Sequence, residues 1–249
     1  MIDLFTGGLD PLVAALLLIV SAFSSFITAS FGIGGGGVML AVLASLLPPA
    51  AIIPVHGVVQ LGSNTGRAAL FVRYTQWQVF WPFVIGSVIG VLIGGMTVVQ
   101  LHPGWLQIAV GVFILWTVVG KPPAFLRKWG AVSGAFSSFL SMFIGGTGPF
   151  VAAYVRAQGY DRHAYVGTHA TLMTVQHGLK VLMFGFLGFA FSEWALFILA
   201  LVLAGFVGTW IGKHMLARIN EAVFKKVLNA ILVLLSLRLV WAGAMRLWG

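Results

Sequence analysis

Two apolar segments of the chain carry polar residues at helical spacing. In the segment at about 50–72 the polar positions follow one another at steps of 4, 3, 1 and 3 residues, which places them on one face of a helix. A similar face recurs at about 164–187. The first face carries His56, Gln60, Ser63, Asn64 and Arg67, and the second carries His169, Thr174, Gln176, His177 and Lys180.

Polar groups are costly in lipid unless they find partners or line a wet cavity, so a cation inside a membrane segment points to a functional site. The alternative is that Arg67 and Lys180 snorkel to an interface and that the amides hold helices together. Both segments place a cation eleven residues after a His. This shared spacing favours a ligand site.

Two glycine-rich breaks precede the two shortest apolar segments, at about 37–47 and 150–158. The breaks run over 32–37 and 145–149. Short segments interrupted by Gly or Pro at matching positions of two halves indicate a transporter binding site. Unwound backbone and helix N-termini there offer N–H groups and a positive dipole end to an anion. The predicted substrate-binding residues are Gly34, Gly35, Gly36, His56, Gln60, Asn64, Arg67, Gly146, Thr147, Gly148, His169, Gln176, His177 and Lys180.

The acidic residues favour an anion over a cation as substrate. The five acids lie near segment ends or in loops, so no carboxylate is placed to bind a cation within the membrane. The six His lack the spacing of three or four residues that sets two ligands on one helix face, and Cys is absent. We therefore predict no metal site and no cofactor. The acids are Asp3, Asp10, Asp161, Glu193 and Glu221.

The elements that position these residues are membrane helices. Hydrophobic residues make up 60% of the 249 positions and charged residues 8%, against roughly 25% charge in a soluble domain. Apolar segments fall at about 11–30, 37–47, 50–72, 77–99, 105–119, 131–144, 150–158, 164–187, 194–212 and 226–245. The sequence predicts an all-α polytopic membrane protein with a single transporter domain over 1–249 and no separate soluble domain.

The two halves of the chain match residue by residue, which indicates internal repeats over 11–120 and 131–246. The stretch Ala22–Phe26 recurs at Ala135–Phe139, an offset of 135 − 22 = 113. The same offset relates His56 to His169 and Arg67 to Lys180, and a later offset of 117 or 118 relates Trp77, Gly90 and Gly94 to Trp194, Gly208 and Gly212. We interpret the glycines as helix-packing positions.

The basic residues predict the topology. If all ten segments cross, the loops on one side receive Arg73, Lys121, Arg127, Lys128, Arg156, Arg162, Lys213, Arg218, Lys225 and Lys226, and the other side receives Arg246. The positive-inside rule then favours ten crossings and an inverted repeat with both termini outside. The length of the two short segments instead fits eight full spans with two short, glycine-interrupted segments that re-enter.

Three stretches resemble the TauE/SafE family of sulfite exporters: 30–37 with its glycines, the repeat that begins at 135–139, and the short basic connection 73–77. The likeness covers nearly the whole chain. The resemblance implies an inner-membrane permease for small anions such as sulfite, organosulfonates, sulfoacetate or other carboxylates, with about eight helices. His56 and His169 stand where the family more often has small residues or Thr-Ser.

The sequence therefore predicts a secondary transporter that exports small anions by alternating access, and not an enzyme. A negative cytoplasm favours anion export by about 2.3 kcal/mol per charge per 100 mV. Import would need a coupling ion, for which His56, His169 and His177 are the buried proton carriers. An anion channel and a membrane-embedded enzyme are the alternatives. The expected partners are the anion and the lipids of the bacterial inner membrane, with no nucleic acid, and self-association is left open.

Overall fold

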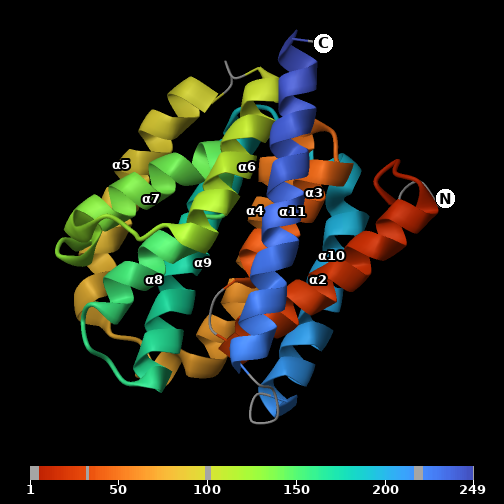
Figure 1. Cartoon of the computed structure of the whole chain (residues 1–249). Helices are drawn as coiled ribbons and strands as arrows, with labels where there is room; N and C mark the ends of the chain where they lie inside the picture. Colours follow the sequence, from red (N-terminus) through yellow and green to blue (C-terminus); the bar gives the residue numbers. More distant parts are fainter. Residues whose placement is uncertain (1–5, 32–33, 99–101, 216–220, 249) are drawn as a thin grey trace.

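The computed structural model describes residues 6–31, 34–98, 102–215 and 221–248, and the side chains of all of these except 31, 213–215 and 221–225. Each of the ten apolar segments corresponds to one α-helix in this part of the chain (Figure 1). The first five helices are α2 (Pro11–Phe31), α3 (Gly35–Leu46), α4 (Pro49–Phe71), α5 (Phe80–Val98) and α6 (Pro103–Val119). The second five are α7 (Gly130–Ile144), α8 (Gly148–Arg156), α9 (Arg162–Phe186), α10 (Phe191–Met215) and α11 (Glu221–Trp248). The all-α prediction is confirmed.

Four helices among the described residues are both long and apolar enough to cross a membrane: Pro11–Ser30, Trp77–Val98, Phe191–Gly212 and Lys226–Trp248. Three shorter apolar helices accompany them, at Gly35–Leu46, Pro103–Val119 and Gly130–Ile144. The helices α4 and α9 reach 23 and 25 residues, but the polar faces described above lower their mean hydropathy. They thus have the length of a span and the composition of a cavity wall.

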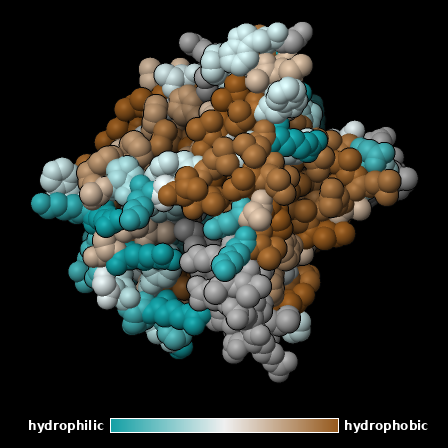
Figure 2. All heavy atoms as spheres, viewed as in Figure 1, coloured by the Kyte–Doolittle hydropathy of each residue, from teal (hydrophilic) through white to brown (hydrophobic). Residues whose placement is uncertain are grey.

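Large apolar side chains cover the outside of the helix bundle. Leu12 is 82% exposed, Met96 78% and Phe186 86%. Figure 2 shows hydrophobic residues across much of the visible face, with hydrophilic residues gathered toward the lower left. So much apolar surface would be unfavourable in water and is stable against lipid tails.

Helices of the first half of the chain pack on helices of the second half. A Cβ added at Gly208 of α10 would collide with the carbonyl oxygen of Ala22 in α2, and one at Gly90 of α5 would collide with that of Ala135 in α7. These two contacts join positions that are equivalent in the internal alignment. Figure 1 accordingly places α5 beside α7 at one edge of the molecule and α2 beside α10 at the other.

The two central helix pairs run antiparallel. In the α4–α9 pair, Gly57 lies against Lys180, and Gly167 lies against Phe71 at the other end. In the α6–α11 pair, Gly104 lies against Leu247 and Gly111 against Val240. By contrast α2 runs parallel to α10, since Ala22 meets Gly208 and Phe26 meets Gly212. Each antiparallel pair joins two helices that the internal alignment of the sequence matches to one another.

Candidate functional site

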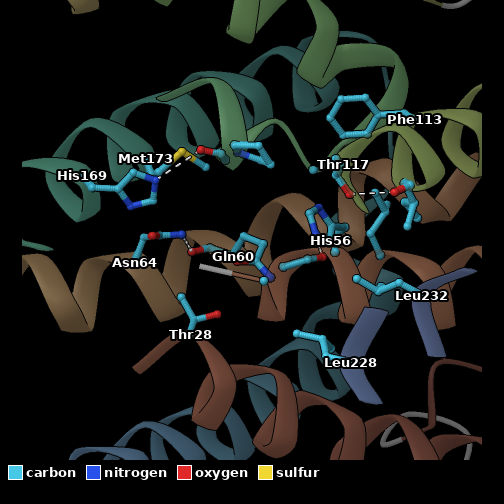
Figure 3. A pocket seen from close by; sticks show the side chains of 18 of the residues that line it. Thr28, His56, Gln60, Asn64, Phe113, Thr117, His169, Met173, Leu228 and Leu232 are labelled. Carbon is cyan, nitrogen blue, oxygen red and sulfur yellow. Dashed lines mark hydrogen bonds between the residues drawn. The ribbon is translucent and has the colours of Figure 1, made fainter. Parts of the chain in front are cut away.

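A cavity of about 240 Å³ lies in the centre of the bundle, between the two glycine breaks and the helices α4, α6, α9 and α11 (Figure 3). Ten of the fourteen residues that the sequence predicts for the site line it. They are Gly34, Gly36, His56, Gln60, Asn64, Arg67, Gly146, Gly148, His169 and His177. The structure thus brings together residues from both halves of the chain.

The α4 side of the cavity is built by helical periodicity. His56, Gln60 and Asn64 are spaced four apart, so they follow one another along one face, as Figure 3 shows. The His56 Nε2 atom lies 3.1 Å from the carbonyl oxygen of Gly36. The Asn64 amide nitrogen donates to the carbonyl oxygen of Gln60 over 2.8 Å. These bonds fix the polar side chains against the short helix α3 and against α4 itself.

Arg67 supplies the positive charge at the end of this face. It is 6% exposed, and its guanidinium donates to Ser63 Oγ over 3.1 Å and to Asn64 Oδ1 over 2.8 Å. Both acceptors are neutral. Two of the five N–H donors of the guanidinium are therefore used, and its charge is not neutralised by either of these partners. A buried cation with neutral partners is suited to an anionic ligand.

The α9 side repeats this arrangement. The His169 Nε2 atom lies 3.4 Å from the carbonyl oxygen of Gly148, as His56 Nε2 lies near that of Gly36. His177 lies deeper, and its ring is 6.0 Å from the ring of His56. The Nδ1 atoms of His56 and His177 are buried without a hydrogen-bond partner among the described residues. Such unpartnered polar atoms beside a cavity leave hydrogen-bonding capacity for a ligand or water.

The glycine breaks set the two short helices against the cavity. Gly34, the N-cap of α3, has φ 110°, and Gly145, the C-cap of α7, has φ 75°. These backbone conformations strain any residue with a Cβ, which explains glycine at both positions. Because the chain turns sharply there, α3 and α8 start beside the cavity. The first-turn N–H groups of a helix have no intrahelical acceptor, so the start of α3 is suited to an anion. The start of α8 offers fewer donors, because Pro149 has no N–H and the Phe150 N–H donates to the carbonyl oxygen of Thr147.

Four predicted residues do not line this cavity. Gly35 faces α2, where a Cβ would collide with the carbonyl oxygen of Ser24. The Gln176 amide donates to Thr147 Oγ1 and accepts a hydrogen bond from Ser137 over 3.0 Å. Neighbouring side chains therefore already provide hydrogen-bond partners for both Gln176 and Thr147. Lys180 is fully buried and donates to the carbonyl oxygen of Gly145 over 3.2 Å. In this structure these residues hold helices together.

The sequence did not single out the remaining cavity residues, although Gly37 and Pro149 lie in the glycine breaks and Met173 lies in the second polar segment. The remaining residues are Thr28, Gly37, Leu40, Phe113, Ile114, Thr117, Val118, Pro149, Arg156, Met173, Leu228, Asn229 and Leu232. Asn229 is a polar residue within the apolar run of α11. Its polarity is the feature of the sequence that could have indicated that α11 contributes to the cavity. The apolar residues of α6 carry no such signal, because a cavity wall and a lipid-facing wall have the same composition there. Arg156, assigned from the sequence to a basic loop, is exposed and lies at the cavity margin.

The charge of the cavity has one sign. Arg67 and Arg156 line it together with three His, and none of the described lining residues is Asp or Glu. Within the described part of the chain there is also no group of three His, Cys, Asp or Glu that could hold a metal ion. In a low-dielectric site a positive field attracts and holds anions.

A comparison with protein families matches residues 17–239 to the model described as sulfite exporter TauE/SafE. The chain belongs to the TauE/SafE family. The match covers nearly the whole length and includes both glycine breaks and both polar helix faces. Comparisons with curated proteins and with solved structures gave no significant match. Family membership and the apolar helices together make the chain a multi-pass membrane protein of a transporter family.

Proposed function

We propose that this TauE/SafE protein is a secondary transporter that exports small oxyanions, such as sulfite, organosulfonates or sulfoacetate, across the bacterial inner membrane. The observation that carries the proposal is the central cavity, which has Arg67 and three His in its wall and no acidic residue among its described lining. The family is described as a sulfite exporter family, which supports the same substrate class.

The size of the cavity supports a small substrate. Its volume of about 240 Å³ is well above the roughly 10–15 Å³ that one water molecule needs. A sulfite or sulfoacetate ion therefore fits with part of its hydration shell. Retained water reduces the desolvation cost of the anion, which permits the weak binding that transport requires.

The hydrogen-bonding groups support an oxyanion. Arg67 has N–H donors beyond the two that bind Ser63 and Asn64, and the amides of Gln60 and Asn64 lie on the same face. An imidazole that donates from Nε2 to a carbonyl accepts at Nδ1 until it takes up a second proton. His56 is arranged in this way and could bind a proton together with the anion. Such a proton is the coupling ion that import would require.

We further propose that the two halves form an inverted repeat with ten crossings. The antiparallel pairing of α4 with α9 and of α6 with α11 supports this topology, because each pair joins equivalent helices. An axis along the membrane normal would relate equivalent helices in parallel, whereas an axis in the membrane plane relates them antiparallel.

We also propose that the central cavity opens toward the cytoplasm. Its margin includes the exposed Arg156, and it extends along the ends of α4 and α6 that lead into basic connections. By the positive-inside rule this basic side is cytoplasmic. An anion bound from this side moves down the membrane potential on export, with about 2.3 kcal/mol per charge per 100 mV.

Binding measurements on the purified protein test the proposal. We expect sulfite, sulfate or sulfoacetate to raise the thermal unfolding temperature, and taurine and lactate to do so less. The Arg67→Gln variant should lose the response, and the matched Arg73→Gln variant should keep it, since Arg73 is exposed and bonded to Tyr74. No response to any of the anions, in protein that unfolds cooperatively, would contradict an oxyanion site.

A further inference from the structure

A second cavity, of about 300 Å³, lies at the opposite ends of the same helices. Its wall includes Ile53 near the start of α4, Leu106 near the start of α6 and Phe184 at the end of α9. The central cavity uses the other ends of these helices, with Arg67 of α4, Thr117 of α6 and His169 of α9. The two cavities are therefore arranged in series across the bundle.

A thin barrier around Gly145 separates them. A Cβ at Gly145 would lie 3.0 Å from Leu40 Cδ1, 3.2 Å from Ile53 Cδ1 and 3.3 Å from His56 Nδ1. Leu40 and His56 line the central cavity, whereas Ile53 lines the second one. All three side chains are buried, with exposures of 0%, 2% and 1%. The backbone of the second glycine break is thus wedged between residues of both cavities.

Lys180 holds this backbone in place. Its Nζ atom donates to the carbonyl oxygen of Gly145 over 3.2 Å, its side chain lies against Gly57 of α4, and it lines neither cavity. Burying an ammonium group in a membrane protein costs free energy, and a single hydrogen bond to a carbonyl oxygen offsets only a small part of this cost. The cost is explained if Lys180 acts in a second state of the protein. Its equivalent in the other half, Arg67, lines the open central cavity.

We propose that the second cavity is an outer vestibule, that the Gly145 segment is the gate between the vestibule and the central cavity, and that Lys180 closes this gate through its hydrogen bond to Gly145. When the gate opens, the ammonium group leaves the carbonyl and faces the central cavity from the outer side, whereas Arg67 lines that cavity in this structure. The anion-binding part of this proposal rests on the proposed function, whereas the gate itself does not.

Site-directed labelling tests the gate cleanly because the chain has no Cys. Thr117 lines the central cavity, on the cytoplasmic side of the proposed gate. In vesicles of known orientation, a membrane-impermeant thiol reagent should label Thr117→Cys rapidly from the cytoplasmic face and slowly from the outer face, because the closed gate separates Thr117 from the vestibule. Adding Lys180→Gln should speed the outer-face reaction about tenfold, which corresponds to about 1.4 kcal/mol, and slow the cytoplasmic-face reaction.

A milder variant covers the case in which Lys180→Gln does not fold. In Gly57→Ala the new Cβ would lie 3.1 Å from Lys180 Cε and would displace the side chain while keeping its charge. The matched control is Gly178→Ala on the facing helix, where the nearest atom is Leu61 Cδ1 at 3.8 Å. Gly57→Ala should raise outer-face labelling of Thr117→Cys, and Gly178→Ala should leave it unchanged. Equal outer-face labelling in the Gly57→Ala and Gly178→Ala backgrounds would overturn the proposed gate.

The anion role of Lys180 has its own readout. In the Gly57→Ala background, sulfite on the outer face should slow the outer-face labelling of Thr117→Cys, and Lys180→Gln should remove this protection. If labelling responds to Gly57→Ala but sulfite has no effect on any variant, the gate stands and the proposed function fails. If sulfite stabilises the wild-type protein but labelling never responds, the function stands and the gate fails.

Discussion

Replacing Arg67 by Gln should weaken anion binding strongly while preserving the fold. The guanidinium lies on the wall of the central cavity, is 6% exposed, and is held by two neutral acceptors on its own helix, Ser63 and Asn64. Gln removes the charge and retains an amide that can still bond to one of these acceptors. The substitution therefore leaves no buried unpaired charge behind.

The expected magnitude follows from the hydrogen bonds that Arg67 has free. Two of its five N–H donors are used within the protein, so at least one charge-assisted bond to the anion is available. A hydrogen bond to a charged group contributes about 1.5–3 kcal/mol, which is about a 10- to 150-fold increase in Kd when it is lost. Arg67→Lys keeps the charge but loses the planar fork, so we expect an intermediate Kd.

Titration calorimetry of purified protein with sulfite measures this change. Arg73→Gln serves as the control because Arg73 is exposed and does not line the cavity. An Arg67→Gln variant with the wild-type Kd would refute the assignment of the central cavity as the anion site. It would leave Arg67 as a cation that merely joins Ser63 and Asn64 on α4.

Three further predictions concern the framework of the site. Gly90→Ala and Gly208→Ala place a methyl group against backbone carbonyls of the opposite half, so each should destabilise the fold by about 1–3 kcal/mol in chemical unfolding, and an effect in one half alone would contradict their equivalence. Single-Cys labelling at Ala124 and Ala157 should occur from the same membrane face if α7 and α8 both cross, and from opposite faces if α8 re-enters. The carboxylate of Asp161 accepts hydrogen bonds from the backbone N–H groups of Ala164 and His163, which hold its pKa below the ordinary value of 3.8. Its stabilising effect is present above that value and is lost as the pH falls through the lowered pKa, so Asp161→Ala should lower the unfolding temperature at neutral pH and differ less from wild type below about pH 4.

The α4 face of the cavity could be predicted from the sequence because helical geometry alone decides it. Residues spaced three and four apart, such as His56, Gln60 and Asn64, share a face wherever the helix lies. Their polarity in an apolar segment then indicates that this face avoids lipid. Position along the chain and residue type were sufficient, and no tertiary information was needed.

The remaining parts of the cavity depend on tertiary packing. Phe113 and Leu232 line the cavity from α6 and α11, yet apolar residues of a membrane helix face lipid and interior alike. Gln176 shares a helix face with His169 in the sequence, but its amide is satisfied by Ser137 and Thr147. A polar residue in a membrane helix is stabilised equally by a ligand or by a neighbouring side chain, so the pattern alone does not separate the two.

Counterflow in proteoliposomes tests the central claim most directly. Vesicles that contain the protein are loaded with unlabelled sulfite and diluted into a trace of radiolabelled sulfite, with the membrane potential held at zero. An oxyanion transporter that works by alternating access should accumulate the label transiently and saturably, and Arg67→Gln should reduce this accumulation. Sulfite flux that neither saturates nor shows counterflow would contradict the account and indicate a channel.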